Sequence, residues 1–314
     1  MMIAIGIDIG GTSIKGAAVT KEGKVLGVFS LRVVKGEPQE ETINKLIEAT
    51  NQYIKEQGFK KEEILGIGCG VPGVMDTKTG VITYSNNLQW YELPIKEMME
   101  KGTGLKVKIT NDANAAALGE QRFGAGKKYK SIIMITLGTG VGGGVVIDGK
   151  LFEGNHGKGA ELGHTVVVVD GELCSCGRRG CLEAYASATG LIRETKKAME
   201  AHKESKLWEI VEKNGKVDAR AAFEADRMGD PAGHELVQNY VKYLGEGLLN
   251  YFNIFRPEAV VLSGGVANEG EYLLSRLRAY FEPDYGFKGT PKVELLVSEL
   301  GYDSGKIGAA ALFF

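Results

Sequence analysis

One segment of the chain, ELGHTVVVVDGELCSCGRRGCLEAY at 161–185, gathers four side chains of types that bind metals. It offers one imidazole and three thiolates, from His164, Cys174, Cys176 and Cys181. These make a complete tetrahedral donor set for structural zinc, which leaves no open position for catalysis by the metal itself. A redox pair is the alternative, but Cys-x-Cys outside a thioredoxin-like context fits it poorly. We therefore expect a structural Zn²⁺ here.

Two carboxylates bracket these ligands. Glu161 stands three residues before His164, and Glu183 stands two residues after Cys181, so that a bound metal would fix both backbones. The carboxylates are either incidental solvated charges or groups that the metal holds in place for binding or catalysis. His156, in the Gly-rich stretch GNHGKG, is expected to be a loop residue rather than a ligand.

Three glycine-rich turns could approach a phosphorylated ligand. DIGGT (8–12) and LGTG (137–140) each follow an apolar run, and Gly264-Gly265 follows a third. Glycine lets backbone N–H groups come close to an anion, threonine adds a hydroxyl, and an aspartate such as Asp8 could hold Mg²⁺. The alternative is that these glycines only serve turns that need a positive φ. Neither a P-loop nor a GxGxxG fingerprint is present.

A further carboxylate, Asp112, lies where the run LKVKITN (105–111) meets the Ala-rich stretch DANAAALGEQRFG (112–124). In this place it is a helix N-cap or first-turn residue, stabilised by backbone N–H groups and the helix dipole. A capped carboxylate is also a positioned one, so a catalytic role is compatible with the structural role. With an ordinary pKa of about 3.9 it would be ionised at neutral pH.

The elements that must position these groups follow from the apolar pattern. Strands are expected at 3–8, 14–20, 24–34, 64–73, 105–111, 258–267 and 293–300, with two more around the glycine turn inside 131–149. Helices are expected at 42–56, 112–124 and 303–314 and across the region 187–254. The stretch 131–149 resembles the first hairpin, which predicts two similar α/β halves, with the last helix crossing back to the first half.

Composition excludes several classes of protein. The 314 residues are 43% apolar and 25% charged, with a net charge of −2, so neither nucleic acid nor an anionic membrane is an expected partner. No apolar run reaches the roughly 20 residues that span a bilayer. The start, MMIAIGIDIGG, lacks the pattern of a signal peptide. Four cysteines in a chain of this size favour a metal site over a disulfide framework, and we expect a cytoplasmic protein.

These motifs carry a resemblance. DIGGT, LGTGVGGG and SGGV are similar to the phosphate and adenosine motifs of the sugar kinase, Hsp70 and actin superfamily. GVPGV, NDANAAALGE, ELGH and CSCGRRGCLEAYAS narrow the resemblance to the ROK family of sugar kinases and sugar-sensing repressors, over essentially the whole chain. Among its members the sequence looks most like a bacterial-type glucokinase.

The resemblance implies two actin-like, ribonuclease H-like α/β domains with ATP and sugar in the cleft between them. We expect a smaller domain at 1–111, joined by the last helix 303–314, and a larger domain at 112–302 that carries the zinc motif. The implied activity is that of a hexokinase-type phosphotransferase, in which ATP phosphorylates glucose to glucose 6-phosphate with Asp112 as the general base.

The resemblance also assigns binding residues. Sugar contacts are expected from Gly73, Asn111, Asp112, Glu161, His164 and Glu183. His164 would bind zinc through one ring nitrogen and sugar through the other, and Gly73 is equally a plain turn residue. ATP, its phosphates and Mg²⁺ are assigned to Asp8, Gly10, Gly11, Thr12, Lys15, Gly138, Thr139, Gly140, Gly264 and Gly265.

Alternatives stay open at this point. The sugar could be another hexose, such as N-acetylmannosamine, fructose or mannose. A sugar-responsive repressor is disfavoured, because the DIGGT strand begins near residue 3 and leaves no room for a preceding helix-turn-helix. Relatives are often dimers or tetramers, so a homodimer or homotetramer is expected.

Overall fold

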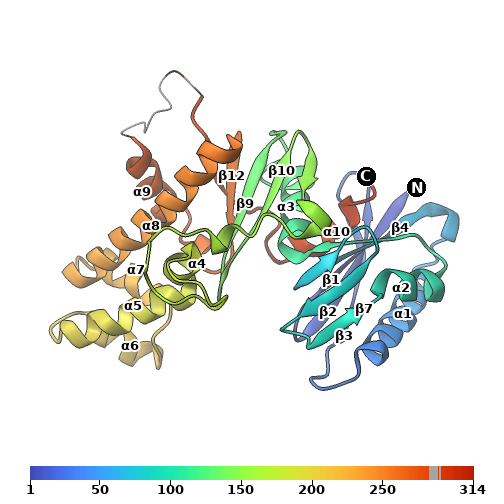
Figure 1. Ribbon diagram of the computed structural model, residues 1–314, viewed down its shortest axis with the longest axis horizontal. Helices are drawn as coiled ribbons and strands as arrows, with labels where there is room; N and C mark the ends of the chain where they lie inside the picture. The colour runs from blue at the N-terminus through green and yellow to red at the C-terminus, as the bar shows by residue number, and fades with distance from the viewer. Residues whose placement is uncertain (283–288, 290) are drawn as a thin grey trace. The chain divides into compact units, whose positions relative to one another are not determined.

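The computed structural model describes residues 1–282, 289 and 291–314 (Figure 1). These residues form a mixture of strands and helices. The strands are β1 (Ile3–Ile9), β2 (Ser13–Thr20), β3 (Val25–Arg32), β4 (Ile64–Val71), β5 (Val74–Asp76), β6 (Val81–Ser85), β7 (Trp90–Leu93), β8 (Val107–Asn111), β9 (Ile132–Leu137), β10 (Val141–Ile147), β11 (Lys150–Phe152), β12 (Ala259–Ser263) and β13 (Glu294–Val297). The α-helices are α1 (Gln39–Glu56), α2 (Ile95–Thr103), α3 (Asp112–Phe123), α4 (Leu182–Ala186), α5 (Ala188–Ala201), α6 (Leu207–Asn214), α7 (Arg220–Arg227), α8 (Pro231–Phe255), α9 (Glu271–Phe281) and α10 (Ser304–Ala311).

Two five-stranded sheets share one strand order. The first runs β3-β2-β1-β4-β8 and the second β11-β10-β9-β12-β13, so that both read 3-2-1-4-5 when the strands of each sheet are numbered along the chain. This repetition confirms the predicted pair of similar α/β halves that each open with a glycine hairpin. A third sheet, β5-β6-β7, was not predicted.

Strand β1 packs differently on its two faces. Its isoleucines, such as Ile5, belong to the core that also contains Ile43 of α1 and Met99 of α2. Ala4 packs instead with Ile307 of α10. Because successive side chains of a strand point to opposite faces of the sheet, α1 and α2 cover one face and α10 the other (Figure 1).

Helix α10 approaches its neighbours through glycines. A Cβ at Gly6 of β1 would lie 1.8 Å from the carbonyl oxygen of Lys306, and one at Gly308 would lie 1.6 Å from that of Ala115 in α3. No side chain fits at either position, so backbone meets backbone. The closing helix is therefore fixed against both β1 and α3.

The chain divides into two compact units. Unit 1 comprises 1–134, 144–160 and 298–314, and unit 2 comprises 135–143 and 161–297. Helix α3 lies in unit 1 because it packs against α10 and β4. Unit 1 includes the closing helix and is the longer of the two units, and neither unit begins or ends at 111/112. The domain bounds expected from the sequence, with a smaller N-terminal domain, stay a prediction.

Helix α8 supports the zinc motif of unit 2. The hydroxyl of Tyr251 lies 2.8 Å from that of Thr165, just after His164, and the hydroxyl of Tyr240 donates to the carbonyl oxygen of Ala186 at 2.9 Å. The helix thereby holds the chain on both sides of the cysteines. Among the described residues, no helix combines the length and apolar character needed to cross a membrane.

Candidate functional site

The carboxyl ends of three parallel strands meet at one edge of the first sheet. Strands β1 and β8 both pair in parallel with β4, with Asp8 opposite Gly70 and Asn111 opposite Val71. Ligands of open α/β sheets bind at this edge. Asp8 and Asn111-Asp112 are therefore brought together from positions about a hundred residues apart in the sequence.

Helix α3 begins at this edge, and two residues at its start accept hydrogen bonds from the N–H groups of its first turn. The Oδ1 of Asn111 is the N-cap acceptor for the backbone N–H groups of Ala113 and Asn114, at 2.9 and 3.4 Å. Asp112 is the first-turn residue, and its Oδ1 also accepts from Ala113 N at 2.9 Å. Of the two structural roles left open for Asp112, it has the first-turn role. The side-chain amide of Asn111 also hydrogen-bonds the carboxylate of Asp112 and lowers its pKa, and an amide has a second N–H to donate.

Burial changes the acid–base chemistry of both aspartates. It raises the pKa of Asp112, against the hydrogen bond from Ala113. It also raises the pKa of Asp8, which the negative charge of Asp112 raises further, while Lys15 and Lys306 lower it. The ordinary pKa assumed for Asp112 from the sequence is therefore wrong, because that value holds for a solvated carboxyl. Two buried carboxylates that repel each other favour a bound cation.

Asp8 is held from two sides. Lys15 lies directly opposite it on β2, and Gly305 in the first turn of α10 packs so closely that a Cβ there would lie 2.8 Å from the carboxyl carbon of Asp8. The amino end of a helix favours a negative charge. Lys15 is thus placed beside the group expected to face Mg²⁺ and phosphate.

The turn glycines do not serve positive φ angles, with one exception. Gly10, Gly11, Gly138 and Gly140 all lie outside the left-handed region, whereas Gly264 has φ +89°. Of these five glycines, only Gly264 is therefore explained by a turn that requires a positive φ. The first turn is closed by a hydrogen bond from Gly10 N to Ser13 O at 3.0 Å, with Thr12 inside it.

Two glycines leave open space where a side chain would be. A Cβ at Gly138 or Gly265 would have no atom of the described chain within 4 Å. At Gly264 it would collide with the backbone of Leu137, at 2.6 Å from the carbonyl oxygen, so that the third turn lies against the end of β9. An uncovered backbone of this kind lets N–H groups reach an anion.

The second turn is braced by the junction of α4 and α5. Ala188 N donates to Gly138 O at 2.8 Å, and the hydroxyl of Thr189 donates to the carbonyl oxygen of Thr139 at 2.7 Å. These bonds fix the carbonyl groups and leave the open side of Gly138 unchanged. The turn is rigid before any ligand binds.

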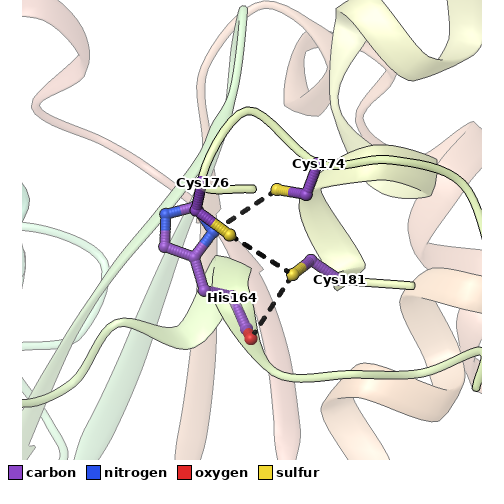
Figure 2. Close-up of side chains that lie close together, drawn as sticks. All are labelled: His164, Cys174, Cys176 and Cys181. Carbon is purple, nitrogen blue, oxygen red and sulfur yellow. Dashed lines mark hydrogen bonds between the residues drawn. The ribbon is translucent and has the colours of Figure 1, made fainter. Parts of the chain in front are cut away.

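The four expected metal ligands do gather in unit 2 (Figure 2). Their donor atoms all lie within 4.8 Å of one another: His164, Cys174, Cys176 and Cys181. The Nδ1 of His164 lies 3.6 Å from the sulfur of Cys174, and the sulfurs of Cys176 and Cys181 are 3.7 Å apart. Around tetrahedral zinc, with Zn–S of about 2.3 Å, sulfur atoms lie about 3.8 Å apart. The number, type and spacing of these donors therefore fit zinc.

The thiols also need a cation on electrostatic grounds. Burial raises the pKa of Cys181 to about 12, and it raises that of Cys174, whereas the backbone N–H of Arg178 lowers the pKa of Cys176. Metal ligation requires thiolates. A metal ion bound here would favour the deprotonated form of the three sulfurs.

Glu183 joins the metal segment to the second glycine turn. Its Oε1 accepts from the hydroxyl of Ser175 at 2.5 Å, and its Oε2 accepts from Val141 N at 3.0 Å. A Cβ at Gly140 would lie 2.4 Å from Oε2, so glycine is needed there to admit the carboxylate. Glu183 is thus no solvated surface charge, whereas Glu161 is exposed.

Gly73 serves its turn as well as any ligand. Its φ of +115° is open to glycine but strained for other residues, and a Cβ would lie 2.4 Å from the carbonyl oxygen of Tyr84. The geometry of the turn is therefore sufficient to explain why glycine occupies position 73. A contact between Gly73 and the sugar stays a prediction.

Comparison with known proteins decides the family. The profile described as ROK family matches residues 4–314, almost the entire sequence. The chain belongs to the ROK family.

Relatives of this ROK protein share nearly its full length. The glucokinase of Halalkalibacterium halodurans is 36% identical over 98% of this chain and 94% of its own, and that of Thermotoga maritima is 38% identical over 98% and 96%. A ROK family glucokinase from Streptomyces griseus, crystallised with glucose and AMPPNP, superposes with a TM-score of 0.78 at 36% identity, covering 99% of this chain and 98% of the other. The predicted family and its actin-like α/β fold are confirmed.

Sequence reasoning missed three contacts of this ROK protein. Ser175 stands between two cysteines, and Thr189 follows Ser187-Ala188, so neither has a pattern that signals its role. The third contact is an ion pair in unit 1, with His156 Nδ1 at 2.8 Å from Asp76 Oδ2. His156 is a loop residue, as expected, but its partner lies eighty positions earlier and could not be identified from spacing.

Proposed function

We propose that this chain is an ATP-dependent glucokinase, which transfers the γ-phosphoryl group of ATP to the 6-hydroxyl of glucose and releases glucose 6-phosphate. One observation carries the proposal. The base and the cation-binding carboxylate that such a reaction requires, Asp112 and Asp8, lie at one edge of one sheet in a chain that is similar to glucokinases over nearly its full length.

Asp112 is the proposed general base. A sugar hydroxyl is far less acidic than a carboxyl group, so Asp112 would orient the hydroxyl and take its proton as the phosphoryl group transfers, in line, to the oxygen. The raised pKa makes Asp112 a stronger base than a solvated aspartate. General-base assistance supplies typically 10²–10⁴-fold in rate.

Positioning and charge stabilisation must supply the rest. Asp8, flanked by Lys15, is the proposed Mg²⁺-binding group, and Mg²⁺ would neutralise charge on the phosphates. The hydroxyl of Thr12 and the backbone N–H groups of Gly11, Thr139 and Gly140 are proposed to contact the phosphates. Gly10 and Gly138 are proposed to shape these turns, because their N–H groups already donate to Ser13 O and Gly140 O. Gly264 and Gly265 are proposed to lie against the adenosine portion, where the open backbone of Gly265 allows close approach.

The sugar hydroxyls are assigned to groups with matching hydrogen-bonding capacity. The amide of Asn111 has a second N–H to donate beside its hydrogen bond to Asp112. Glu161 is an exposed acceptor, and His164 has Nε2 free when Nδ1 faces the metal. Glu183 retains lone pairs beside the hydrogen bonds that it accepts from Val141, Ser175 and Cys174. Gly73 offers its backbone. Zn²⁺ bound by His164, Cys174, Cys176 and Cys181 would supply only rigidity, because the donor set is complete.

The test is a sugar panel in an ADP-release assay. Purified protein with Mg²⁺ and ATP is given glucose, mannose, fructose or N-acetylmannosamine, and the product is identified by mass and by chromatography. Glucose should have the highest kcat/KM. A higher value for another hexose would reassign the substrate, and no ADP release with any sugar would overturn the kinase proposal.

We also propose a cellular location and an oligomeric state for this glucokinase. Because ATP is the donor, we place the protein in the cytoplasm. We also propose a homodimer or homotetramer, which light scattering on the purified protein would decide; a monomeric mass would refute it.

A further inference from the structure

A short loop of unit 1, which precedes Glu161 in the sequence, packs against the end of strand β5. The Glu153–Gly159 loop closes on itself through a hydrogen bond from Gly159 N to Glu153 O at 2.8 Å. His156 Nδ1 lies 2.8 Å from Asp76 Oδ2 at the end of β5. The backbone of Gly157 packs on the next residue, since a Cβ there would lie 2.6 Å from the side chain of Thr77. Two adjacent contacts thus fasten the loop to β5.

Asp76 is equipped for this role. Its Oδ1 accepts from the backbone N–H groups of Lys78 and Thr79, at 2.9 and 3.2 Å, which leaves Oδ2 for His156. The hydrogen bond with His156 is the largest cause that lowers the pKa of Asp76 to about 2. The acceptor is therefore fully ionised across the physiological range, and both of its oxygens are directed by the fold.

The loop backbone would not adopt this shape without an anchor. His156 has φ 55° and ψ 28°, and Ala160 has φ 62°, both left-handed values that non-glycine residues rarely adopt. Such conformations persist only where surrounding contacts impose them, and they gather at ligand-binding segments. The imidazole of His156 is 48% exposed, so the ring is held by its hydrogen bond to Asp76 rather than by burial, next to the packing of Gly157 on Thr77.

Three backbone segments with proposed sugar contacts lead to this loop. Asp76 stands three residues after Gly73, and the loop runs through Ala160 into Glu161. At the base of the loop, Glu153 accepts from the hydroxyl of Thr110 at 2.6 Å, directly before Asn111. Displacement of the loop would therefore disturb the backbone at each of these contacts.

We infer that Asp76 and His156 form a positioning pair for the sugar, which sets the affinity for glucose without taking part in phosphoryl transfer. The inference rests on the proposed glucokinase function. Neither side chain touches reacting atoms; the pair acts through the backbone of Gly73 and Glu161. Loss of the pair should therefore raise the KM for glucose and leave kcat and the KM for ATP unchanged.

The experiment compares wild-type enzyme with His156→Ala, Asp76→Asn, the double variant and His156→Asn. Loss of a hydrogen bond to a charged group should raise the glucose KM about ten-fold in His156→Ala, with kcat within about two-fold. The double variant should be no worse than His156→Ala, since both remove one interaction. His156→Asn should recover most of the affinity, because asparagine tolerates left-handed φ and its amide can donate to Asp76. His202→Ala is the matched control, as His202 is an exposed histidine 3.4 Å from Glu204.

Two results would overturn the inference in an active wild-type enzyme. One is a glucose KM in His156→Ala equal to that of His202→Ala. The other is a parallel change of kcat and both KM values that His156→Asn does not rescue, which would mean general loss of structure. A wild-type protein that phosphorylates no sugar refutes the proposed function first, and this inference with it.

Discussion

The carboxylate of Glu183 accepts a hydrogen bond from Val141 N at 3.0 Å, so a residue of the zinc segment holds the strand that leaves the second glycine turn. The other oxygen of Glu183 accepts from Ser175. In a ROK kinase this joins a proposed sugar ligand to a proposed phosphate-binding turn within unit 2. Binding of one substrate can therefore influence binding of the other through a single carboxylate.

Replacing Glu183 tests this connection. In Glu183→Gln one carboxylate oxygen is replaced by an NH₂ group, which cannot accept a hydrogen bond. The hydrogen bond from either Ser175 or Val141 is therefore lost. We expect KM to rise for glucose by about ten-fold and for ATP by several-fold. Glu161→Gln is the matched control, because Glu161 is exposed and should affect glucose alone. An unchanged KM for ATP in Glu183→Gln would contradict the connection.

The general base is tested by Asp112→Asn. The amide retains Oδ1 as an acceptor for Ala113 N, so helix α3 should still form, while the proton acceptor is lost. We expect kcat to fall by about 10²–10⁴-fold, with the Kd for glucose by calorimetry within several-fold of wild type. Asp148→Asn, at an exposed turn, should be fully active. Near-normal kcat in Asp112→Asn would refute the assignment.

The raised pKa of Asp112 predicts a pH profile. The base acts only when deprotonated, so kcat/KM should fall as the pH decreases through the folded-state pKa. Because burial raises this pKa above its ordinary value, the acid limb should lie at higher pH than for a solvated aspartate. Rates at saturating Mg²⁺ and ATP, with circular dichroism to verify folding, measure it. An acid limb near the ordinary pKa would contradict the buried environment.

Loss of the metal should affect both stability and sugar binding. Wild-type protein is expected to contain one zinc per chain by mass spectrometry, and Cys176→Ser to contain none. The variant should unfold at a lower temperature. Its glucose KM should rise about ten-fold, because changes to the groups that support a metal site typically lower metal affinity or activity by 10–100-fold. Cys69→Ala removes a buried thiol outside the cluster and is the control. A metal-free protein with an unchanged glucose KM would separate the metal from the sugar site.

The open space at Gly138 predicts a selective effect on nucleotide. A methyl group there meets no atom of the described chain within 4 Å, so Gly138→Ala should keep its melting temperature. The same methyl would occupy the approach to the backbone N–H groups, and the KM for ATP should rise at least ten-fold, as for an overpacked contact worth roughly 1–3 kcal/mol. The glucose Kd without nucleotide serves as the internal control. A variant with the wild-type KM for ATP would exclude phosphate from this turn.

Sequence patterns predicted features that are local or repeated. The hairpin glycines, the Ala-rich helix after Asn111 and the cysteine cluster each depend on residues close together in the chain, and all were found. The sheet β5-β6-β7 was missed, since its strands are short and Gln89 and Glu92 adopt positive φ that no pattern signals. The pKa of Asp112 and the partners of Glu183 and His156 depend on distant residues, so they required coordinates.

Helix α10 has a consequence for the order of folding. Unit 1 is complete only with residues 298–314, which follow the whole of unit 2 in the chain. During synthesis the face of β1 around Ala4 and Gly6 must wait for its covering helix while unit 2 can already form. Asp8 and its neighbour Asp112, the proposed base, therefore acquire their buried surroundings only after helix α10 has been made.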